Sequence, residues 1–436
     1  MMWIRNGMMV DPANGIEELA DIMIKDGKIA DVRILSKNDT TKEIKENIDM
    51  QNIDEIDASG CVVAPGLVDV HVHFRDPGFT YKEDIETGAR AALQGGFTSV
   101  VLMANTKPAV DNKETLQYVM EKGAKTDLHV YTCAAVTKGL GGKEMTDMQV
   151  LFEEGAVGFT DDGIPVMNEK LMEAAMLKTA ELGVPISLHE EDPALITNNG
   201  INRGTVSEHF GIGGSPREAE ISLIKRDLEI ATRTGAILNV QHISTKEGVE
   251  LVRKAKAQPG GEHIHAEATP HHFSLTQEAV LQHGTLAKMN PPLREESDRQ
   301  AIIKGLQDGT IDLIATDHAP HSEEEKSKPL TEAPSGIIGL ETALSLGITN
   351  LVDQGNLSIS RMISCMACNP AKMYGLQAGT LSIGAPADIV IFNPNESWTV
   401  KEFASKSTNS PFKGECLKGV IKYTIVDGKI VYQNKK

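Results

Sequence analysis

The sequence predicts an α/β protein that is built on a (β/α)8 TIM-type barrel and carries a small β-sandwich domain formed by both chain termini. Three observations lead to this prediction. Eight short apolar runs alternate with helical segments, polar residues follow several runs directly, and two similar hairpin sequences lie near the two ends of the chain. Strands that alternate with helices are typical of a parallel sheet.

The eight apolar runs account for the barrel. They are residues 61–70, 97–103, 128–134, 157–160, 185–188, 236–241, 263–267 and 311–316. Helical patterns follow at 84–93, 169–182, 217–234 and 298–307, and glycines 95, 96, 183 and 235 stand where helices should end. Eight such units favour a closed barrel. A doubly wound open sheet is the alternative, but no glycine-rich phosphate-binding sequence follows the first run.

The two ends of the chain account for the small domain. Ile24-Lys-Asp-Gly-Lys-Ile29 resembles Ile425-Val-Asp-Gly-Lys-Ile430, and Asp-Gly between β-prone residues is a strong hairpin signal. Short strands are expected at 3–5, 30–35, 389–392 and 420–426, and turns at 380–388. We therefore assign residues 1–62 and 373–436 to one composite β domain and residues 63–372 to the barrel. Two unrelated terminal hairpins are the alternative.

Charge and composition narrow the classes of function. The formal net charge is −18, which argues against nucleic acid and anionic membrane partners because both need a basic surface. The sequence has no signal-like start and no apolar run of membrane-spanning length, so we expect a cytoplasmic protein. The five cysteines lack disulfide-framework spacing. Cys365 and Cys368 form a CxxC pair, which we interpret as two small buried helix residues rather than a redox or zinc site.

Polar residues gather at the carboxyl ends of five predicted strands. They are His71 and His73 on the first run, Asp161 and Asp162 on the fourth, His189 on the fifth, His242 on the sixth, and Asp317 with His318 on the eighth. Residues two apart on a strand share a face, and in a parallel barrel all these ends meet at one mouth. Four imidazoles with one or two carboxylates suit Zn²⁺.

A metal site of this kind predicts hydrolysis. A bound cation lowers the pKa of water from about 16 to about 7 and so provides a nucleophile at neutral pH. Asp317 is the expected general base and acid, and a purely structural ligand role is the alternative. The remaining histidines are expected in the core or at the surface, with a supporting role left open for the last three: His129, His209, His263, His283, His265, His271 and His272.

Several longer motifs resemble those of dihydroorotases of the bacterial class I, within the amidohydrolase superfamily. The resemblance extends from about residue 20 to 430. The motifs are Pro65-Gly-Leu-Val-Asp-Val-His71-Val-His73-Phe-Arg75-Asp-Pro-Gly78, Glu83-Asp-Ile-Glu-Thr-Gly-Ala-Arg90, Gly95-Gly-Phe-Thr98, Ala104-Asn105-Thr-Lys-Pro108, Lys288-Met-Asn290-Pro-Pro-Leu-Arg294, Ala315-Thr-Asp317-His-Ala-Pro-His321 and Gly339-Leu-Glu-Thr342.

The resemblance implies a reaction and a set of roles. The reaction is the reversible conversion of dihydroorotate to N-carbamoyl-L-aspartate in pyrimidine biosynthesis, with two zinc ions per subunit. The implied metal ligands are His71, His73, Asp162, His189, His242 and Asp317, of which Asp162 bridges the ions and Asp317 is also catalytic. The implied substrate-binding residues are His73, Arg75, Asn105, Asn290, His321, Ser335 and Gly336. Arg75 would provide local positive charge for an anionic substrate.

Two features depart from related sequences. Many amidohydrolases bridge the metals with a carboxylated lysine on the fourth strand, whereas this chain has Asp161-Asp162 there; the spacing to His189 favours Asp162 as the bridge. Ser335 precedes Gly336 where dihydroorotases usually have Phe, so that substrate contact has no apolar wall. The charged loop 322–334 fits a mobile lid or an ordinary solvated loop.

Alternative functions stay open at this point. An allantoinase or hydantoinase would share the barrel and the metals, although Arg75, Asn105 and Asn290 favour a substrate with a free carboxylate. A metal-free structural partner of aspartate transcarbamoylase would lack the ligands that this chain has. We expect a homodimer, and a complex of the active enzyme with aspartate transcarbamoylase also stays open.

Overall fold

The computed structural model describes residues 1–35 and 54–435, so parts of the predicted small domain, residues 36–53 and 436, lie outside the described residues. Eight parallel strands form one sheet in chain order, as predicted. A parallel bridge between Val72 and His318 joins the first strand to the segment after the last, which closes the barrel. The strands are β6 (Leu67–Val72), β7 (Phe97–Leu102), β8 (His129–Ala134), β9 (Gly158–Phe159), β10 (Ile186–Leu188), β11 (Leu238–Val240), β12 (Ile264–Ala268) and β13 (Leu313–Ile314).

The first apolar run is divided between the two sheets. The sequence predicts one strand at 61–70, but β5 (Val62–Pro65) pairs with β1 and β14 in the terminal sheet, and β6 begins only at Leu67. The prediction of a single strand is therefore wrong. The division falls at Gly66, where an added Cβ would lie 2.2 Å from the Thr98 side chain, so the buried Thr98 leaves no room for a larger residue.

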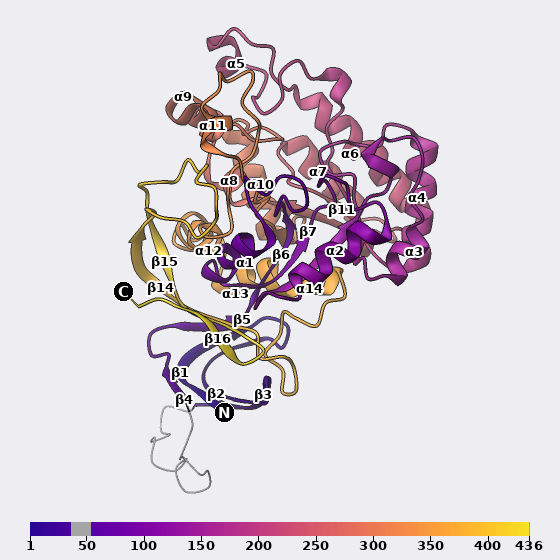
Figure 1. Cartoon of the computed structure of the whole chain (residues 1–436). Coiled ribbons are helices and arrows are strands. Elements are labelled where there is room, and N and C mark those ends of the chain that lie inside the picture. Colours follow the sequence, from indigo (N-terminus) through magenta and orange to yellow (C-terminus); the bar gives the residue numbers. More distant parts are fainter. Residues whose placement is uncertain (36–53, 436) are drawn as a thin grey trace, which may run out of the picture.

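Helices cover the outside of the barrel (Figure 1). All four predicted helices begin and end within two residues of their expected positions, with Asp84 capping the first through a hydrogen bond from the Thr87 backbone. The helices are α1 (Ile85–Gln94), α2 (Lys113–Gly123), α3 (Met148–Glu153), α4 (Glu169–Leu182), α5 (Thr205–His209), α6 (Arg217–Thr234), α7 (Lys246–Lys256), α8 (Pro270–Ser274), α9 (Ala279–His283), α10 (Glu296–Asp308), α11 (Glu323–Lys326), α12 (Ala343–Gly347), α13 (Ile359–Ile363) and α14 (Asn369–Met373).

The inside of the barrel is apolar towards its amino-terminal end. Val68, Val101 and Leu313 pack there in one buried cluster with Met373 and Tyr374 from the end of α14. Cys365 and Cys368 lie on the helical segment just before α14, Cys365 buried and Cys368 half-buried, and both are free thiols. The predicted reading of the CxxC pair as helix residues is consistent with this placement. Apolar side chains thus fill this part of the barrel, and the predicted site residues lie at the ends of the strands.

Both chain ends contribute to one second sheet, as predicted. Its strand order is β16-β15-β14-β5-β1-β2-β3, with β4 (Asp54–Asp57) paired to β1. The other strands are β1 (Met2–Asp11), β2 (Ile16–Lys25), β3 (Lys28–Ile34), β14 (Ile389–Thr399), β15 (Cys416–Val426) and β16 (Lys429–Gln433). The two Asp-Gly turns lie against each other, because the Gly27 carbonyl accepts a hydrogen bond from Ala387, whose own carbonyl accepts one from Gly428. Figure 1 shows this sheet at one end of the molecule, beside both termini.

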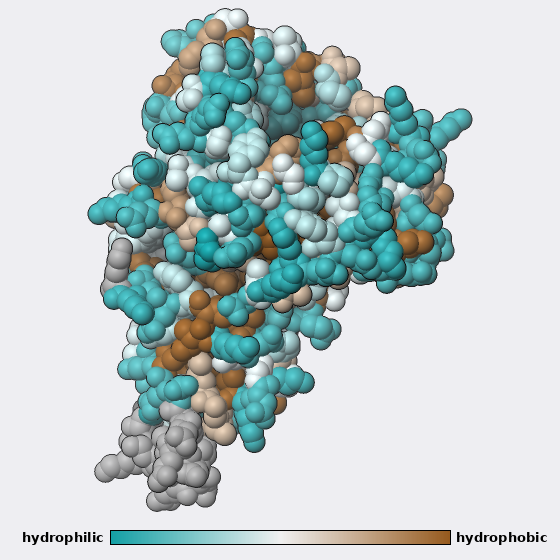
Figure 2. All heavy atoms as spheres, in the orientation of Figure 1, coloured by the Kyte–Doolittle hydropathy of each residue, from teal (hydrophilic) through white to brown (hydrophobic). Residues whose placement is uncertain are grey.

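The surface agrees with the strongly acidic composition. The face in Figure 2 is mainly hydrophilic, with smaller apolar areas. Within the described residues, no helix combines the length and apolar character that crossing a lipid bilayer requires.

Candidate active site

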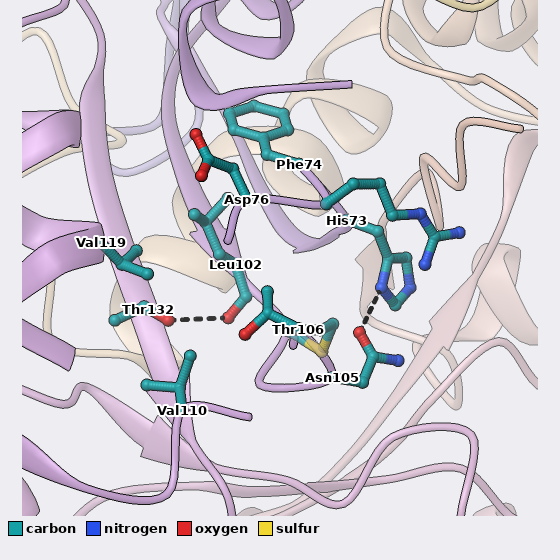
Figure 3. A pocket seen from close by; sticks show the side chains of 11 residues that line it. His73, Phe74, Asp76, Leu102, Asn105, Thr106, Val110, Val119 and Thr132 are labelled. Carbon is teal, nitrogen blue, oxygen red and sulfur yellow. Dashed lines mark hydrogen bonds between the residues drawn. The ribbon is translucent and has the colours of Figure 1, made fainter. Parts of the chain in front are cut away.

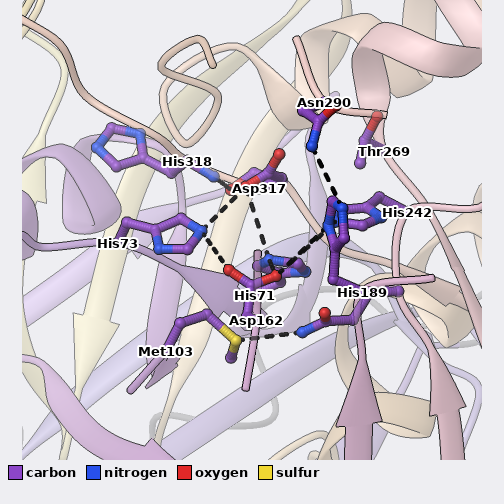
Figure 4. Close-up of polar contacts among 12 residues, drawn as sticks. His71, His73, Met103, Asp162, His189, His242, Thr269, Asn290, Asp317 and His318 are labelled. Carbon is purple, nitrogen blue, oxygen red and sulfur yellow. Dashed lines mark hydrogen bonds and ion pairs between the residues drawn. The ribbon is translucent and has the colours of Figure 1, made fainter. Parts of the chain in front are cut away.

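Six side chains predicted from five strand ends meet at the mouth of the barrel (Figure 4). His73 Nε2 lies 3.1 Å from Asp317 Oδ1 and 3.4 Å from Asp162 Oδ2, and His71 Nε2 lies 3.5 Å from Asp162 Oδ1 and 3.6 Å from Asp317 Oδ1. The other two histidines approach from the opposite side: His189 Nδ1 and His242 Nε2 are each 3.9 Å from Asp162 Oδ1. We call these six residues the His/Asp cluster.

The two neighbouring aspartates face in different directions. Asp162 points into the His/Asp cluster, whereas Asp161 accepts hydrogen bonds from the backbone and the hydroxyl of Thr137. Strand alternation allows only one of the two side chains to face the barrel interior. Asp162 is therefore the aspartate positioned between the histidine pairs, as the spacing to His189 had suggested.

Each of three histidines has a polar partner at the ring nitrogen that faces away from the cluster, and for His71 and His73 this partner accepts a hydrogen bond. His73 Nδ1 donates to Asn105 Oδ1 at 2.9 Å, as Figure 3 shows, and Asn105 Nδ2 donates to Asp162 Oδ2 at 2.9 Å. His71 Nδ1 lies 2.9 Å from Glu267 Oε2, and His189 Nε2 lies 3.3 Å from Glu191 Oε2. The nitrogens left facing the cluster contact its other members and are positioned to act as ligands.

Burial and charge oppose each other at the cluster. Burial would lower the pKa of His71, but the carboxylates of Glu267 and Asp162 raise it well above its usual value. Burial would raise the pKa of Asp162, yet His71, His73 and His189 hold it well below its usual value. For His242, burial and the neighbouring His189 and His71 both lower the pKa. The site therefore has strong charges in a low-dielectric environment, which favours a bound cation.

The donor set fits divalent metal ions. Ligand atoms lie within 4.8 Å of one another in two overlapping groups, one of His71, His73 and Asp317 and one of His71, Asp162 and His242. His71 Nε2 is buried and has no hydrogen-bond partner within the described part of the chain. Histidine nitrogens and carboxylate oxygens around such an atom suit zinc. A bound cation would replace the second proton on the His71 ring, which the neighbouring carboxylates otherwise favour.

A cationic region adjoins the cluster. Arg75 is half-buried with φ +59°, and its Nε donates to the Pro320 carbonyl at 3.3 Å. Burial lowers the pKa of Arg75, while the carboxylates of Asp317 and Asp162 oppose that effect. His321 lies beside it, donating from Nε2 to the Ser335 carbonyl at 2.8 Å and accepting at Nδ1 from Lys82 Nζ at 3.3 Å.

The backbone at residues 335 and 336 is hydrogen-bonded internally. The Ser335 carbonyl accepts from His321, and the Gly336 N–H donates to the Lys288 carbonyl at 2.9 Å. The Ser335 hydroxyl is buried without a hydrogen-bond partner among the described residues. In this arrangement the predicted backbone contacts to a substrate are already used by the protein.

The charged loop 322–334, which leads to Ser335, is more firmly held than its composition predicts. Its first turn forms α11, which Ser322 caps, and Lys326 is only 5% exposed. Burial lowers the pKa of Lys326 to about 7, and its Nζ donates to the carbonyls of Pro334 and Gly336, each at 3.0 Å. A buried lysine that binds carbonyls is not a feature of a solvated loop.

Asn290 reaches the cluster from the other side of the mouth. Its Nδ2 donates to His189 Nε2 at 3.2 Å, and its Oδ1 is buried without a partner among the described residues. The histidines left out of the site occupy plainer positions: His129 pairs with Asp388, His265 with Asp312, and His272 Nε2 with the Pro291 carbonyl. His318 follows Asp317, but its ring faces Glu83 at 3.4 Å.

Sequence reasoning did not find four residues that support the site. Glu267 lies beside His71 of the His/Asp cluster, and Glu191 lies beside His189. Lys82 donates a hydrogen bond to His321, and Asn409 Nδ2 donates to the carbonyls of Ala319 and Gly336. Glu267 ends the seventh predicted run and Glu191 lies two residues after His189, so their positions were visible signals. Asn409 lies in the long excursion between β14 and β15, where nothing in the sequence points to the mouth.

Comparisons with known proteins agree on a family. A family model described as dihydro-orotase-like matches residues 60–248, and an amidohydrolase family model matches residues 341–432. The chain is 54% identical over 432 residues to a dihydroorotase from Clostridioides difficile (strain 630), covering 99% of this chain and 100% of that one. It is 50% identical over 438 residues to a dihydroorotase from Clostridium acetobutylicum, covering 100% of both.

Solved structures share the architecture. An L-hydantoinase (dihydropyrimidinase) from Arthrobacter aurescens superposes with a TM-score of 0.85 at 26% identity, covering 100% of this chain and 96% of that one. A dihydropyrimidinase from Brevibacillus agri NCHU1002, at 22% identity and a TM-score of 0.84, covers 100% and 95% and shares the fold. The barrel and the appended sheet are thus a known combination.

Proposed function

The chain belongs to the dihydroorotase family of cyclic amidohydrolases, and from this premise we propose that it catalyses the reversible hydrolysis of (S)-dihydroorotate to N-carbamoyl-L-aspartate in pyrimidine biosynthesis. The observation that carries the proposal is the His/Asp cluster with the half-buried Arg75 beside it, in a chain that is about half identical to dihydroorotases along its whole length.

The cluster residues would hold two zinc ions. His71, His73 and Asp317 form one group of donors, His189 and His242 form the other, and Asp162 lies between them. When bound, the two cations lower the pKa of a water molecule and polarise a carbonyl group.

Asp317 moves the proton. Its Oδ1 lies 3.1 Å from His73 Nε2, so the carboxylate is held at the edge of the cluster where the attacking water enters. The carboxylate takes a proton from this water as the oxygen bonds to the ring carbonyl carbon, and then protonates the ring nitrogen as the carbon–nitrogen bond breaks. In the reverse direction the same group deprotonates the ureido nitrogen before ring closure.

Arg75 binds the substrate carboxylate. A guanidinium matches a carboxylate with two parallel hydrogen bonds, and the chain's net charge of −18 makes a local cation necessary for an anionic substrate. Asn105 and His321 flank this position, and Asn290 offers to the ring N–H a buried carbonyl oxygen that has no hydrogen-bond partner among the described residues. Asn105 exchanges one of its contacts to His73 or Asp162 when it binds substrate.

A substrate comparison tests the proposal. Purified protein loaded with zinc is assayed with dihydroorotate, hydantoin and allantoin at equal concentrations. We expect dihydroorotate to be hydrolysed with a kcat/KM at least about 100-fold above the others, because only dihydroorotate presents a free carboxylate to Arg75. Turnover of hydantoin or allantoin without turnover of dihydroorotate would replace the proposal with its nearest alternative.

Assembly and location extend the proposal. We infer that the protein is cytoplasmic, which agrees with five free cysteines, and that it acts on its small anionic substrate as a homodimer. A complex with aspartate transcarbamoylase is a further partner to test by co-purification.

A further inference from the structure

One carboxylate beneath the His/Asp cluster contacts two of its histidines. Glu267 lies on β12, the only barrel strand besides β7 and β8 that contributes no residue to the predicted metal site, and its side chain is fully buried. Glu267 Oε2 lies 2.9 Å from His71 Nδ1 and 3.4 Å from the backbone nitrogen of His242. These two histidines belong to opposite halves of the cluster.

The contact to His71 fixes which ring nitrogen faces the cluster. A carboxylate can only accept a hydrogen bond, so His71 must carry its proton on Nδ1. His71 Nε2 is thereby directed at the space between Asp162 Oδ1 and Asp317 Oδ1, at 3.5 and 3.6 Å. It is the nitrogen that has no hydrogen-bond partner in the described part of the chain.

The contact to His242 supports an unusual backbone. His242 has φ +31°, in the left-handed region that a non-glycine residue seldom adopts. The N–H of this residue points at Glu267, and this turn of the chain brings His242 Nε2 to 3.9 Å from Asp162 Oδ1. One carboxylate thus constrains the ring of one ligand and the backbone of another.

Glu267 is itself braced from the interior of the barrel. Asn239 Nδ2 donates to Glu267 Oε1 at 2.5 Å and to Ser187 Oγ at 2.7 Å. Asn239 and Ser187 lie on the adjacent strands β11 and β10 and are fully buried. With one oxygen held by Asn239 and the other shared by the two histidines, the carboxylate has little freedom to rotate.

We propose that Glu267 is a positioning residue that directs the Nε2 atoms of His71 and His242 into the His/Asp cluster and thereby sets the affinity of the cluster for its metal ions. The inference rests on the proposed function. Hydrogen bonds behind metal-ligating histidines typically change metal affinity by 10- to 100-fold when they are removed. Glu267 touches neither substrate nor the reacting atoms in this account.

The test compares two variants that make the same chemical change. Glu267→Gln keeps the size of the side chain and removes its charge, and Glu341→Gln does the same to a buried carboxylate that accepts hydrogen bonds from Gln94 and the backbone of Ala404 and Ser405. Zinc affinity is measured on metal-free protein by competition with a chromophoric chelator, and the melting temperature of each metal-free protein is recorded.

We expect Glu267→Gln to bind zinc 10- to 100-fold more weakly while Glu341→Gln binds it like the wild type. At saturating zinc, the KM for dihydroorotate should stay within about twofold, because Arg75 is untouched. Wild-type zinc affinity in a folded Glu267→Gln protein would overturn the proposal.

A measurement on the unaltered protein decides the matter if Glu267→Gln does not fold. In zinc-loaded wild type labelled with ¹⁵N-histidine, we expect the His71 signals to show metal at Nε2 and a proton at Nδ1. Coordination through Nδ1 would overturn the positioning role. Failure of the proposed function has a different signature, because the wild-type protein would then neither bind zinc at the cluster nor hydrolyse dihydroorotate.

Discussion

Replacing Asp317 by Asn isolates the proton-transfer step. The residue has φ +47°, a backbone conformation in which Asn and Asp are the most readily accepted side chains after glycine, so the substitution adds no backbone strain. Asn keeps one oxygen that can lie where Oδ1 now lies, 3.1 Å from His73 Nε2 and 3.6 Å from His71 Nε2. What it loses is the negative charge and the ability to accept and release a proton.

The expected loss of rate follows from these two changes. General acid–base catalysis by one positioned side chain contributes about 10²- to 10⁴-fold to a rate. Asp317 acts twice in one turnover, first on the water and then on the ring nitrogen, so the upper part of that range applies. We expect kcat to fall by about 10³-fold or more, which is roughly 4 kcal/mol of transition-state stabilisation.

The assay follows dihydroorotate hydrolysis at saturating zinc, with zinc content measured on the same samples. Asp312→Asn is the matched control, since Asp312 lies five residues earlier and pairs with His265 and Lys256 away from the cluster. The control should keep kcat within about twofold and the Asp317 variant should retain most of its zinc. A kcat for Asp317→Asn within tenfold of the wild type would refute the assignment of Asp317 as the proton carrier.

Three further variants test separate parts of the account. Arg75→Ala should raise KM by about 10- to 100-fold with a smaller effect on kcat, because a charge-assisted hydrogen bond is worth roughly 1.5–3 kcal/mol, and an unchanged KM in steady-state kinetics would remove Arg75 from the carboxylate site. His129→Gln tests the 3.1 Å pair with Asp388 beneath the barrel: the hydrogen bond from Asp388 raises the pKa of His129 in the folded state, so its stabilisation, about 1 kcal/mol, is complete below pH about 6.5 and is lost as pH rises through the raised pKa. Urea unfolding should therefore separate variant from wild type at pH 6 and not at pH 9, and an equal difference at both pH values would contradict this. Gly88→Ala would place a Cβ 2.4 Å from the ring of Phe74, next to His73, and should cost about 1–3 kcal/mol in thermal unfolding; a wild-type melting temperature would show that the ring moves freely.

The barrel could be predicted because its signals are local. Each strand is a short apolar run, five of the runs end at a polar residue of the site, and the predicted helices carry caps, as Asp84 and Gly183 show. The positions of His71 and Asp317 at strand ends then follow from the fold alone. Residues 62–65 were wrongly assigned to the first barrel strand. A buried strand of the terminal sheet and a buried strand of the barrel have the same apolar sequence pattern.

The supporting contacts could not be predicted because they depend on distances between segments that are remote in sequence. Glu267 and His71 are 196 residues apart, and the sequence gives no measure of which carboxylate lies behind which imidazole. The same holds for Lys326. Its charge predicts an exposed side chain, whereas its ammonium group is buried and donates to the carbonyls of Pro334 and Gly336. A long polar side chain can be buried when several carbonyl groups accept hydrogen bonds from it, because these bonds replace its contacts with water.

Anomalous diffraction at the zinc absorption edge, from a crystal grown with zinc and N-carbamoyl-L-aspartate, tests most directly whether the barrel mouth is a two-metal site. We expect two peaks on either side of Asp162, one bounded by His71, His73 and Asp317 and the other by His189 and His242, with a ligand carboxylate at Arg75. Peaks elsewhere on the molecule, with none among these residues, would contradict the account.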